Sequence, residues 1–512
     1  MIKVENLVAG VWQTNPKAKT FQTVNPKTNK SISNEFEEAN KDQIDQAVKK
    51  ASSVFESFSE TSFSERIEFL KAIQKQLNLK KGEILNIYQL ESALPSARAE
   101  GEFQRTLGQI QEFIELLALG SFINPIINTN GPDLRKMLFP IGPIAVFGAS
   151  NFPLAFSTAG GDTISAFAAG CPVIVKAHPF HAGTSALVAE AILNAIEYCS
   201  LPLEIFSHLG GISHNVGSEL VNHSALKGVG FTGSFIGGKA LYDLAQKREE
   251  PIPVFAEMGS VNPIFITEKR LENDKNLSDT LAQSIVLGTG QFCTNPGIII
   301  FCDSKGKSDM VTQVNQKLNQ MELPPMVHLN IESNYLKKIE DLNNIEGLKV
   351  YKQSKNIAAL GLISASVLLE NKELVDEVFG PFSLFVKCSS IEQMSELAKI
   401  IPGQLTGTLL SDKNDQVGLK KLVNQIKNKV GRLLFEGVPT GVAVTKAMQH
   451  GGPYPASSDG RFTSVGTDSI YRWLRPIVFQ DCPNVLLPSA LKDENPLAIE
   501  RSVNGQMTKK AI

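Results

Sequence analysis

The chain of 512 residues is too long for one compact hydrophobic core, so its length predicts two or more domains. Hydrophobic residues make up 42% and charged residues 20%, which is ordinary for a globular protein and argues against a disordered one. The formal net charge of -2 at pH 7 leaves no large basic field for nucleic acid or an anionic membrane surface. We therefore expect neither of these as a partner.

Apolar segments and cysteines give two further expectations. The longest apolar stretch, about residues 140–153, is too short to span a membrane and contains glycines, and the first residues lack an apolar signal core. No CxxC pair occurs among the six cysteines, which are Cys171, Cys199, Cys293, Cys302, Cys388 and Cys482. This scatter argues against a disulfide framework or a zinc site, so we expect reduced thiols, a cytoplasmic protein and no metal.

The first third of the chain changes its pattern near residue 120. Residues 42–119 carry apolar side chains at three- and four-residue steps and few helix breakers, which predicts a run of helices. Residues 122–138 differ, because Asn130-Gly131 there lies between extended flanks. Asn-Gly in this setting predicts a β-hairpin, which we expect to project from the body of the protein.

Short apolar strands alternate with helix-forming segments after residue 141. The predicted strands are residues 144–148, 172–176 and 228–232, and the predicted helices are 157–169, 185–198 and one from about 235. This alternation predicts the α/β class, with a parallel sheet covered by helices on both faces. A second α/β region begins near Pro263, with strand candidates at 263–266, 297–301, 382–387 and 433–435. No Ser/Pro-rich linker separates the regions, so we expect a shared cleft for cofactor and substrate.

Cys293 is the cysteine whose surroundings indicate chemistry. It lies between Gly288-Thr289-Gly290 and Asn295-Pro296-Gly297, and these glycines and the proline predict a loop. A thiol on such a loop can face a cleft, where its thiolate can attack a carbonyl carbon. The alternative is a small buried core residue, which is the commoner fate of a free cysteine.

Two other side chains are candidates for work beside a nucleophile. Glu257 ends an apolar run before Met258-Gly259, where burial would raise the pKa of its carboxyl and suit it to general-base catalysis. Asn151 follows the first predicted sheet strand, where its amide could donate to an oxyanion. Taken alone, Glu257 also fits an exposed strand end and Asn151 an ordinary turn.

Two segments suggest a nucleotide site. Lys176 ends a predicted strand, where it could bind ribose or phosphate or equally well be solvated. Phe231-Thr232-Gly233-Ser234 is not the GxGxxG fingerprint, which disfavours a reductase without covalent catalysis. A strand, a Gly-Ser turn and a helix nevertheless present backbone N–H groups to a pyrophosphate.

The order of these motifs resembles the aldehyde dehydrogenase superfamily, from about Asn25 to Pro476. The ordered motifs are Asn151, Lys176, 231–234, 257–259, Cys293 and Glu377-Val378-Phe379-Gly380-Pro381. Residues 147–156, 159–163 and 175–179 are similar to one branch of that superfamily. This branch contains α-ketoglutaric semialdehyde dehydrogenases and an NADP-dependent fatty aldehyde dehydrogenase.

The resemblance implies NAD(P)-dependent oxidation of an aldehyde to a carboxylic acid through a covalent intermediate. Cys293 would attack the aldehyde, and the Asn151 amide and the Cys293 backbone N–H would hold the oxyanion of the thiohemiacetal. Hydride transfer would leave a thioester, and Glu257 would activate the water that hydrolyses it. A CoA-acylating enzyme has no need of that base, and an inactive scaffold would be expected to lack these residues, so both alternatives are disfavoured.

The resemblance also assigns contacts with cofactor and substrate. Gly233 and Ser234 would lie against the pyrophosphate, Lys176 near the adenosine ribose, and Glu377 and Phe379 at the nicotinamide end. Aromatic side chains would line the substrate funnel, namely Phe152, Phe156 and Phe292, for which a plain core role is an equal alternative.

Two departures from the family bear on the choice between NAD and NADP. Where NAD-preferring members carry a glutamate, three residues after the Lys176 position, this chain has Pro179, so no carboxylate there repels a 2′-phosphate. Where NADP-dependent relatives have an arginine, in the segment 211–216, the nearest counterpart is His214, a conditional cation at neutral pH. We predict that both cofactors are used and that neither is strongly excluded.

The substrate is expected to be a small aldehyde, with α-ketoglutaric semialdehyde (2,5-dioxopentanoate), giving 2-oxoglutarate, as the first candidate. A broad-specificity aliphatic or aromatic aldehyde dehydrogenase is the alternative. A semialdehyde that bears a carboxylate needs a cation in the funnel, for which we select Arg105. A surface ion pair is the alternative role for this arginine.

The resemblance further predicts two doubly wound α/β domains and a β-hairpin arm for oligomerisation. Residues 1–121 and 142–256 would form the NAD(P)-binding domain, 257–466 the catalytic domain, and 122–141 and 467–512 the bridging segments. Because an extended arm cannot bury its apolar side alone, we expect a homodimer or a homotetramer.

Overall fold

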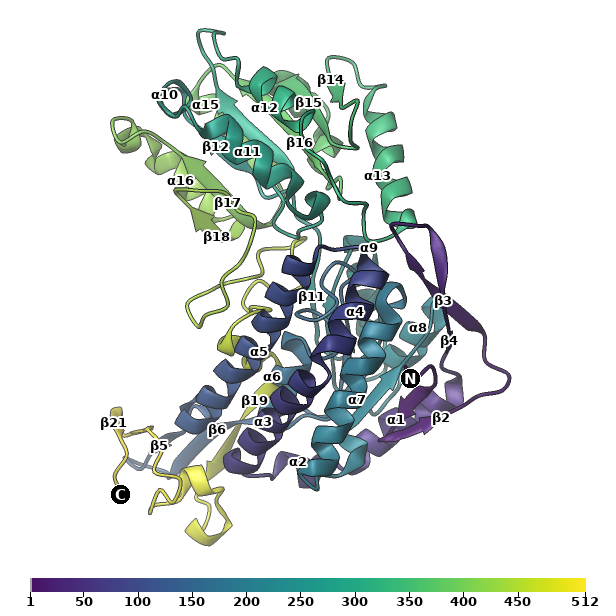
Figure 1. Ribbon diagram of the computed structural model, residues 1–512. Coiled ribbons are helices and arrows are strands. Elements are labelled where there is room, and N and C mark those ends of the chain that lie inside the picture. The colour runs from purple at the N-terminus through teal and green to yellow at the C-terminus, as the bar shows by residue number, and fades with distance from the viewer. Residues whose placement is uncertain (1) are drawn as a thin grey trace.

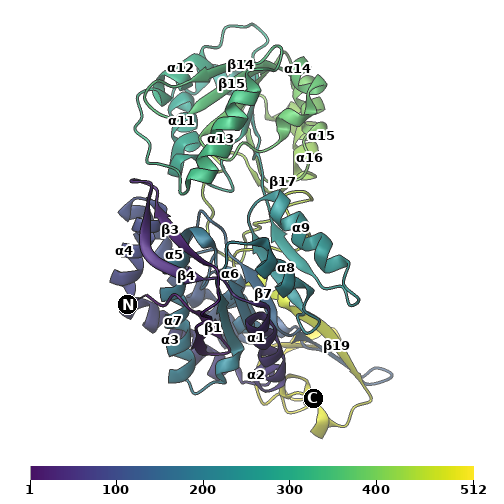
Figure 2. The ribbon, with the colours of Figure 1, turned by 90° about the vertical axis from the view of Figure 1, so that its right-hand side faces the viewer.

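The computed structural model describes residues 2–512 and contains two lobes and an arm of strands (Figures 1 and 2). Each lobe is built around a seven-stranded sheet, and the arm is a five-stranded sheet. The predicted α/β class with a hairpin arm is therefore confirmed. The predicted bounds of the domains remain a prediction.

The first lobe holds a mostly parallel sheet. Its strands, in spatial order, are β11 (Val254–Glu257), β10 (Gly228–Thr232), β7 (Ile144–Phe147), β8 (Val173–Lys176), β9 (Phe206–Leu209), β1 (Asn6–Val8) and β2 (Val11–Gln13). The first five run parallel, whereas β1 pairs antiparallel with both β9 and β2. The strands predicted at 144–148, 172–176 and 228–232 are thus β7, β8 and β10. A separate two-stranded hairpin is formed by β3 (Thr20–Asn25) and β4 (Lys30–Glu37), which the sequence patterns did not predict.

Helices cover both faces of this sheet because its side chains alternate between the faces. Val146 and Val175 join one apolar core, whereas Ala145 and Ile174 join another on the opposite side. Helices that line the first core are α3 (Phe63–Leu79), α4 (Lys81–Ser92), α5 (Ser96–Leu119), α6 (Gly161–Ala169) and α7 (Ala182–Tyr198). Helices on the second are α1 (Lys41–Ser53), α8 (His214–Asn222) and α9 (Phe235–Gln246), and the short α2 (Phe55–Ser59) follows α1.

The predicted helix at 157–169 is wrong at its start, because α6 begins only at Gly161. The chain before it folds back so tightly that a Cβ atom at Gly160 would lie 2.7 Å from the carbonyl oxygen of Ala155. Apolar and small residues before Gly160 therefore form buried turns and not a helical turn.

The second lobe has the same architecture. Its strands, in spatial order, are β14 (Lys349–Lys352), β15 (Ala359–Ser364), β16 (Phe382–Cys388), β13 (Ile298–Cys302), β12 (Ile264–Ile266), β17 (Gln404–Leu410) and β18 (Val430–Leu434). All pairs are parallel except β14 with β15. The helices are α10 (Glu268–Asn273), α11 (Leu277–Val286), α12 (Met310–Leu318), α13 (Leu329–Leu342), α14 (Ala365–Glu370), α15 (Ile391–Ile400) and α16 (Lys420–Lys427).

The arm joins distant parts of the chain. Its strands, in spatial order, are β19 (Leu474–Gln480), β6 (Leu134–Pro140), β5 (Ile126–Asn128), β20 (Arg501–Val503) and β21 (Gln506–Thr508). The antiparallel pair β5 and β6 confirms the hairpin predicted from Asn130-Gly131. The C-terminal residues, expected within the bridging segment 467–512, extend this sheet with β20 and β21.

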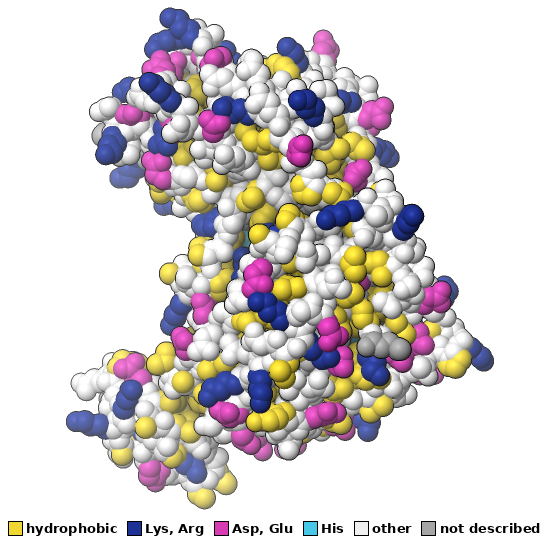
Figure 3. Space-filling model, in the orientation of Figure 1, with side chains coloured by type: hydrophobic (Ala, Val, Ile, Leu, Met, Phe, Trp, Pro, Cys, Tyr) yellow, Lys and Arg dark blue, Asp and Glu magenta, His cyan; other side chains and the backbone are white. Residues whose placement is uncertain are grey.

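The surface of the two lobes carries charged side chains of both signs among apolar and neutral ones (Figure 3). No helix within residues 2–512 is long and apolar enough to cross a membrane.

Candidate active site

The loop that carries Cys293 is fixed from two sides. It follows a short 3-10 helix at Leu287–Gly290, and a Cβ atom at Gly290 would collide with the carbonyl group of Gly380. The buried Asn262 side chain donates to the Cys293 carbonyl at 2.9 Å and to the Asn295 carbonyl at 2.8 Å. Cys293 itself is half-buried, so the predicted loop is confirmed and its thiol is not enclosed in a core.

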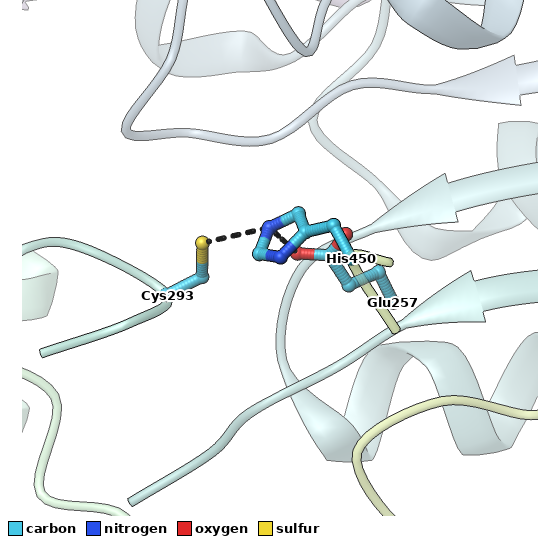
Figure 4. Close-up of side chains that lie close together, drawn as sticks. All are labelled: Glu257, Cys293 and His450. Carbon is cyan, nitrogen blue, oxygen red and sulfur yellow. Dashed lines mark hydrogen bonds and ion pairs between the residues drawn. The ribbon is translucent and has the colours of Figure 1, made fainter. Parts of the chain in front are cut away.

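Three side chains from separate segments meet at this loop (Figure 4). Glu257 ends β11 in the first lobe, Cys293 precedes β13 in the second, and His450 comes from the segment that returns to the first. His450 Nε2 lies 3.4 Å from Cys293 Sγ and 3.0 Å from Glu257 Oε1. The trio Cys293–His450–Glu257 therefore links a thiol to a carboxylate through one imidazole.

The charges of this trio depend on one another. Burial alone would lower the pKa of His450, but the charges of Glu257 and Cys293 raise it to about 10. Burial also acts to raise the pKa of Glu257, yet the charge of His450 and hydrogen bonds from His450 and Ser464 outweigh it and hold the pKa below its ordinary value. At neutral pH the pair is thus imidazolium and carboxylate. Our expectation that burial would raise the pKa of Glu257 is wrong, because a cation shares its site.

His450 is the residue that the sequence interpretation missed. It is a single histidine before Gly451-Gly452-Pro453, with no spacing that relates it to Cys293 or Glu257. A lone histidine beside a glycine-rich turn carries no local signal of its role.

Asn151 contacts the loop that carries Cys293 from the first lobe. It follows β7, as predicted, and its side-chain amide donates to the carbonyl of Gln291 at 2.8 Å. Because Gln291 is two residues before Cys293, this contact brings the amide to the nucleophile loop. Its part in oxyanion binding remains a prediction.

The predicted funnel aromatics form one cluster next to the trio. The Phe152 ring centroid lies 5.2 Å from that of Phe156 and 5.6 Å from that of Phe292. Phe156 in turn lies 6.1 Å from the ring of His450. The structure thus brings all three aromatics together beside His450, where they pack as a small core cluster.

Two arginines of α5 border this aromatic cluster. The guanidinium of Arg105 lies 5.4 Å from the Phe156 ring centre, and its Nη1 donates to the Val442 carbonyl at 3.3 Å. Burial lowers the pKa of Arg105, while the nearby charge of Cys293 acts to raise it. Arg105 is therefore half-buried beside the aromatic cluster, and none of the ion pairs found within residues 2–512 includes it.

Arg98 is a second cation that the sequence interpretation did not select. Its guanidinium carbon lies 4.3 Å from the Phe152 ring centre and 4.4 Å from that of Phe292. Arg98 precedes Arg105 by seven residues, which is two helical turns, so both project from one side of α5. That spacing is the signal that could have identified it.

The predicted ribose contact, Lys176, is half-buried at the end of β8. Its Nζ donates to the carbonyl of Gly211 at 2.6 Å, and burial lowers its pKa to about 8, against the opposing charge of Glu38. Glu38 accepts hydrogen bonds from the N–H groups of Ile212 and Ser213 at 3.0 and 2.9 Å. A carboxylate thus stands at the segment where the sequence interpretation considered only His214.

His214 and Pro179 occupy the starts of helical segments. His214 is exposed and begins α8, and Pro179 begins a 3-10 turn that ends at His181. Position 179 therefore has no carboxylate, as expected. The carboxylate of Glu38, which directly follows β4, lies instead at residues 212–213.

The glycine motif lies directly beside Glu257. The Gly233 N–H donates to the Glu257 carbonyl at 3.0 Å, and Ser234 caps α9 by accepting from the Gly237 N–H at 3.2 Å. The side chains that follow are exposed although apolar, with Phe235 at 40% and Ile236 at 81%. The start of α9 thus offers free backbone donors next to an apolar surface, which suits a nucleotide.

Glu377 of the second lobe packs against Gly259, just after β11. Its carboxylate lies so close to Gly259 that a Cβ atom there would collide with it, and burial raises its pKa to about 7. Phe379 follows two residues later and is half-buried. Glu377 therefore lies against Gly259, two residues after Glu257.

A half-buried thiol, a carboxylate and an amide thus lie together between two α/β lobes. Residues 12–473 match the aldehyde dehydrogenase family, and the chain belongs to this family. It is 41% identical over 509 residues to the alpha-ketoglutaric semialdehyde dehydrogenase of Acinetobacter baylyi, with 96% of each chain covered. It is 39% identical over 479 residues to alpha-ketoglutaric semialdehyde dehydrogenase 2 of Azospirillum brasilense, which covers 90% of this chain and 91% of that one.

Solved structures of more distant relatives share the fold. Betaine aldehyde dehydrogenase of Staphylococcus aureus gives a TM-score of 0.81 at 18% identity, covering 94% of this chain and 96% of that one. A 1-pyrroline-5-carboxylate dehydrogenase from Thermus with bound NAD gives a TM-score of 0.79 at 19% identity, covering 93% and 92%. The predicted resemblance is confirmed: the chain is an oxidoreductase that oxidises an aldehyde to a carboxylic acid with NAD or NADP.

The contact between His450 and Cys293 predicts a change in thiol reactivity. Because an adjacent cation favours the reactive thiolate, we expect His450→Gln to slow alkylation of Cys293 by iodoacetamide at pH 7 about tenfold. The rate is measured by mass spectrometry of the Cys293 peptide, since Cys199 and Cys482 are also partly exposed. The matched control is His223→Gln, whose imidazole pairs instead with Asp45 at 3.3 Å. An equal rate in the wild type and both variants would contradict the prediction.

Proposed function

We propose that the chain oxidises α-ketoglutaric semialdehyde (2,5-dioxopentanoate) to 2-oxoglutarate. The observation that carries this proposal is the pair of arginines, Arg98 and Arg105, beside the aromatic cluster that leads to Cys293. A short substrate with a carboxylate at the end opposite its aldehyde fits a cationic border of this kind. The identity of about two fifths to two alpha-ketoglutaric semialdehyde dehydrogenases supports the same substrate.

The proposed reaction begins at the Cys293 sulfur. Its thiolate adds to the aldehyde carbon, and the resulting oxyanion accepts hydrogen bonds from the Asn151 amide and the Cys293 N–H. Loss of hydride from this carbon leaves a thioester on Cys293. Glu257 then takes a proton from water, the hydroxide adds to the thioester carbonyl, and collapse of that adduct releases the carboxylic acid and the thiolate.

The residues at the start of α9 and around Lys176 and Glu377 fit a bound dinucleotide. When bound, NAD or NADP supplies a nicotinamide that accepts the hydride. Gly233 and Ser234 at the start of α9, Lys176 and Glu377 would hold it, with Phe379 at the nicotinamide end. The exposed apolar surface of Ile236 suits the flat base of a nucleotide.

His450 would serve the two halves of the reaction differently. In the resting enzyme its cation stabilises both the Cys293 thiolate and the Glu257 carboxylate. Once the sulfur is acylated, only the carboxylate keeps its attraction to the imidazolium. We therefore assign His450 an electrostatic role, in addition to the nucleophile and the base.

The arm supports a homodimer or a homotetramer as the working assembly. Apolar side chains of its strands are exposed, such as Val478 at 53% and Met507 at 61%, and so is Val485, at 78%, in the segment between β19 and β20. A second copy of the chain could cover them.

The six cysteines, all free thiols, support a cytoplasmic location.

The proposed substrate is tested with an aldehyde panel run with NAD and NADP, with Cys293→Ala as the blank. We expect the highest kcat/KM for α-ketoglutaric semialdehyde and no acyl-CoA when CoA is added, because Glu257 directs the thioester to water. Activity that survives in Cys293→Ala would overturn the mechanism. A higher kcat/KM for an uncharged aliphatic or aromatic aldehyde would favour a broad-specificity enzyme instead.

The cofactor site predicts comparable use of NAD and NADP, with kcat/KM values that differ by less than about a thousandfold, or roughly 4 kcal/mol. Glu38 is expected to disfavour the 2′-phosphate of NADP. We expect Glu38→Gln to raise kcat/KM for NADP relative to NAD about fivefold, since removing one nearby like charge is worth roughly 1 kcal/mol. A larger difference in kcat/KM between the cofactors would contradict their comparable use. An unchanged NADP-to-NAD ratio in Glu38→Gln would contradict the role of Glu38.

The two arginines predict a loss that depends on substrate charge. We expect Arg105→Ala to lower kcat/KM for α-ketoglutaric semialdehyde about a hundredfold, because a charge-assisted hydrogen bond is worth roughly 1.5–3 kcal/mol. Arg98→Ala should act in the same direction. Pentanal, which has the same carbon count without the carboxylate, is the control and should lose less than about threefold. Unchanged activity of Arg105→Ala on the semialdehyde would remove Arg105 from the substrate site.

A further inference from the structure

Cys293, His450 and Glu257 present a set of atoms that a soft divalent cation prefers. A thiolate sulfur, an imidazole nitrogen and a carboxylate oxygen lie within 4.8 Å of one another, the one such group of three within residues 2–512. Soft thiolate and imidazole ligands select Zn²⁺ over Mg²⁺ or Ca²⁺. The expectation of no metal was based on cysteine spacing, which says nothing about ligands from three distant segments.

The distances between these atoms approach those of a zinc site. Bonds of about 2.3 Å to sulfur and about 2.0–2.2 Å to nitrogen and oxygen, in a tetrahedron, place ligand atoms about 3.4–3.6 Å apart. The observed distance from Cys293 Sγ to His450 Nε2 is 3.4 Å, and that from Nε2 to Glu257 Oε1 is 3.0 Å. The first pair is close to the required separation, the second needs to open by about 0.4 Å, and the third, from Cys293 Sγ to the Glu257 carboxylate, lies within 4.8 Å.

The surroundings suit a site with three protein ligands. Glu257 and His450 are 4% and 2% exposed, so both are fixed by packing, whereas Cys293 is half-buried. The fourth position of the tetrahedron can therefore face the exposed side of Cys293 and take a water molecule. Two anionic ligands also balance the charge of the ion.

We propose that Cys293, His450 and Glu257 form an inhibitory site that binds one Zn²⁺ per chain, with water as the fourth ligand. The ion takes the lone pairs of the thiolate, the neutral Nε2 and one carboxylate oxygen. The proton carried by Nε2 passes to solvent, and nothing is oxidised or reduced. Bound zinc occupies the nucleophile and the base together, so neither addition to the aldehyde nor activation of water can occur.

The binding test uses the full-length protein with Co²⁺, which takes the same ligands as Zn²⁺ and absorbs light. We expect one Co²⁺ per chain, a thiolate-to-cobalt charge-transfer band, and loss of that band when one equivalent of Zn²⁺ is added. Cys293→Ala should abolish the band, and both Cys293→Ala and His450→Gln should weaken Zn²⁺ binding at least about a hundredfold in competition with a chelating dye. Cys482→Ala is the control for surface thiols and should bind as the wild type does.

The outcomes separate this site from the proposed function, because binding needs no turnover. Equal Zn²⁺ affinity in the wild type and Cys293→Ala would overturn the proposal, and Cys293→Ala decides the matter by itself if circular dichroism shows that His450→Gln is unfolded. A site of this kind also predicts that Zn²⁺ blocks aldehyde oxidation and that EDTA restores it. Recovery with a thiol reductant but not with EDTA would indicate oxidation of Cys293 and would overturn the inhibitory role.

Discussion

The buried ion pair between Glu257 and His450 is the interaction on which the site depends. Two charges that are almost fully removed from water are costly unless each is paired and hydrogen-bonded. Here the Ser464 hydroxyl donates to the Glu257 carboxylate, and the backbone N–H of His450 donates to Thr463 Oγ1 at 3.0 Å. The segment that carries the histidine therefore also supplies a hydrogen bond to its carboxylate partner.

That segment is attached to the first lobe along β11. The Met258 N–H donates to the Ala456 carbonyl at 2.8 Å, and the Ala256 N–H donates to Ser458 Oγ at 2.9 Å. The return of the chain from the second lobe thus completes the edge of the sheet that ends in Glu257. Because Cys293 comes from the second lobe, the reactive group exists only where both lobes and this segment meet (Figures 1 and 4).

Local patterns were sufficient for elements whose signals lie within a few residues. The apolar runs of β7, β8 and β10 and the Asn-Gly turn of the arm are of this kind. The same holds for the Cys293 loop, where glycines and a proline exclude a helix. The start of α6 was misplaced because contacts around Gly160, and not helix propensity, decide where the chain can turn.

The parts of the site that could not be predicted arise from contacts between distant residues. The sign of the pKa shift of Glu257 is set by His450, which is 193 positions later in the sequence. Glu38 meets Lys176 and the 212–213 turn only through the fold. Arg98 differs, because its seven-residue spacing from Arg105 on a predicted helix was available from the sequence.

Helix α5 joins the substrate end of the molecule to the arm. Arg98 and Arg105 are near its start, and Gly120, which ends it, packs against Ile499 of the C-terminal tail. Its 24 residues make a rod of about 36 Å. A helix of this length keeps its two ends at a fixed separation, so a shift of the C-terminal tail against Gly120 would also move the end of the helix that carries the two arginines.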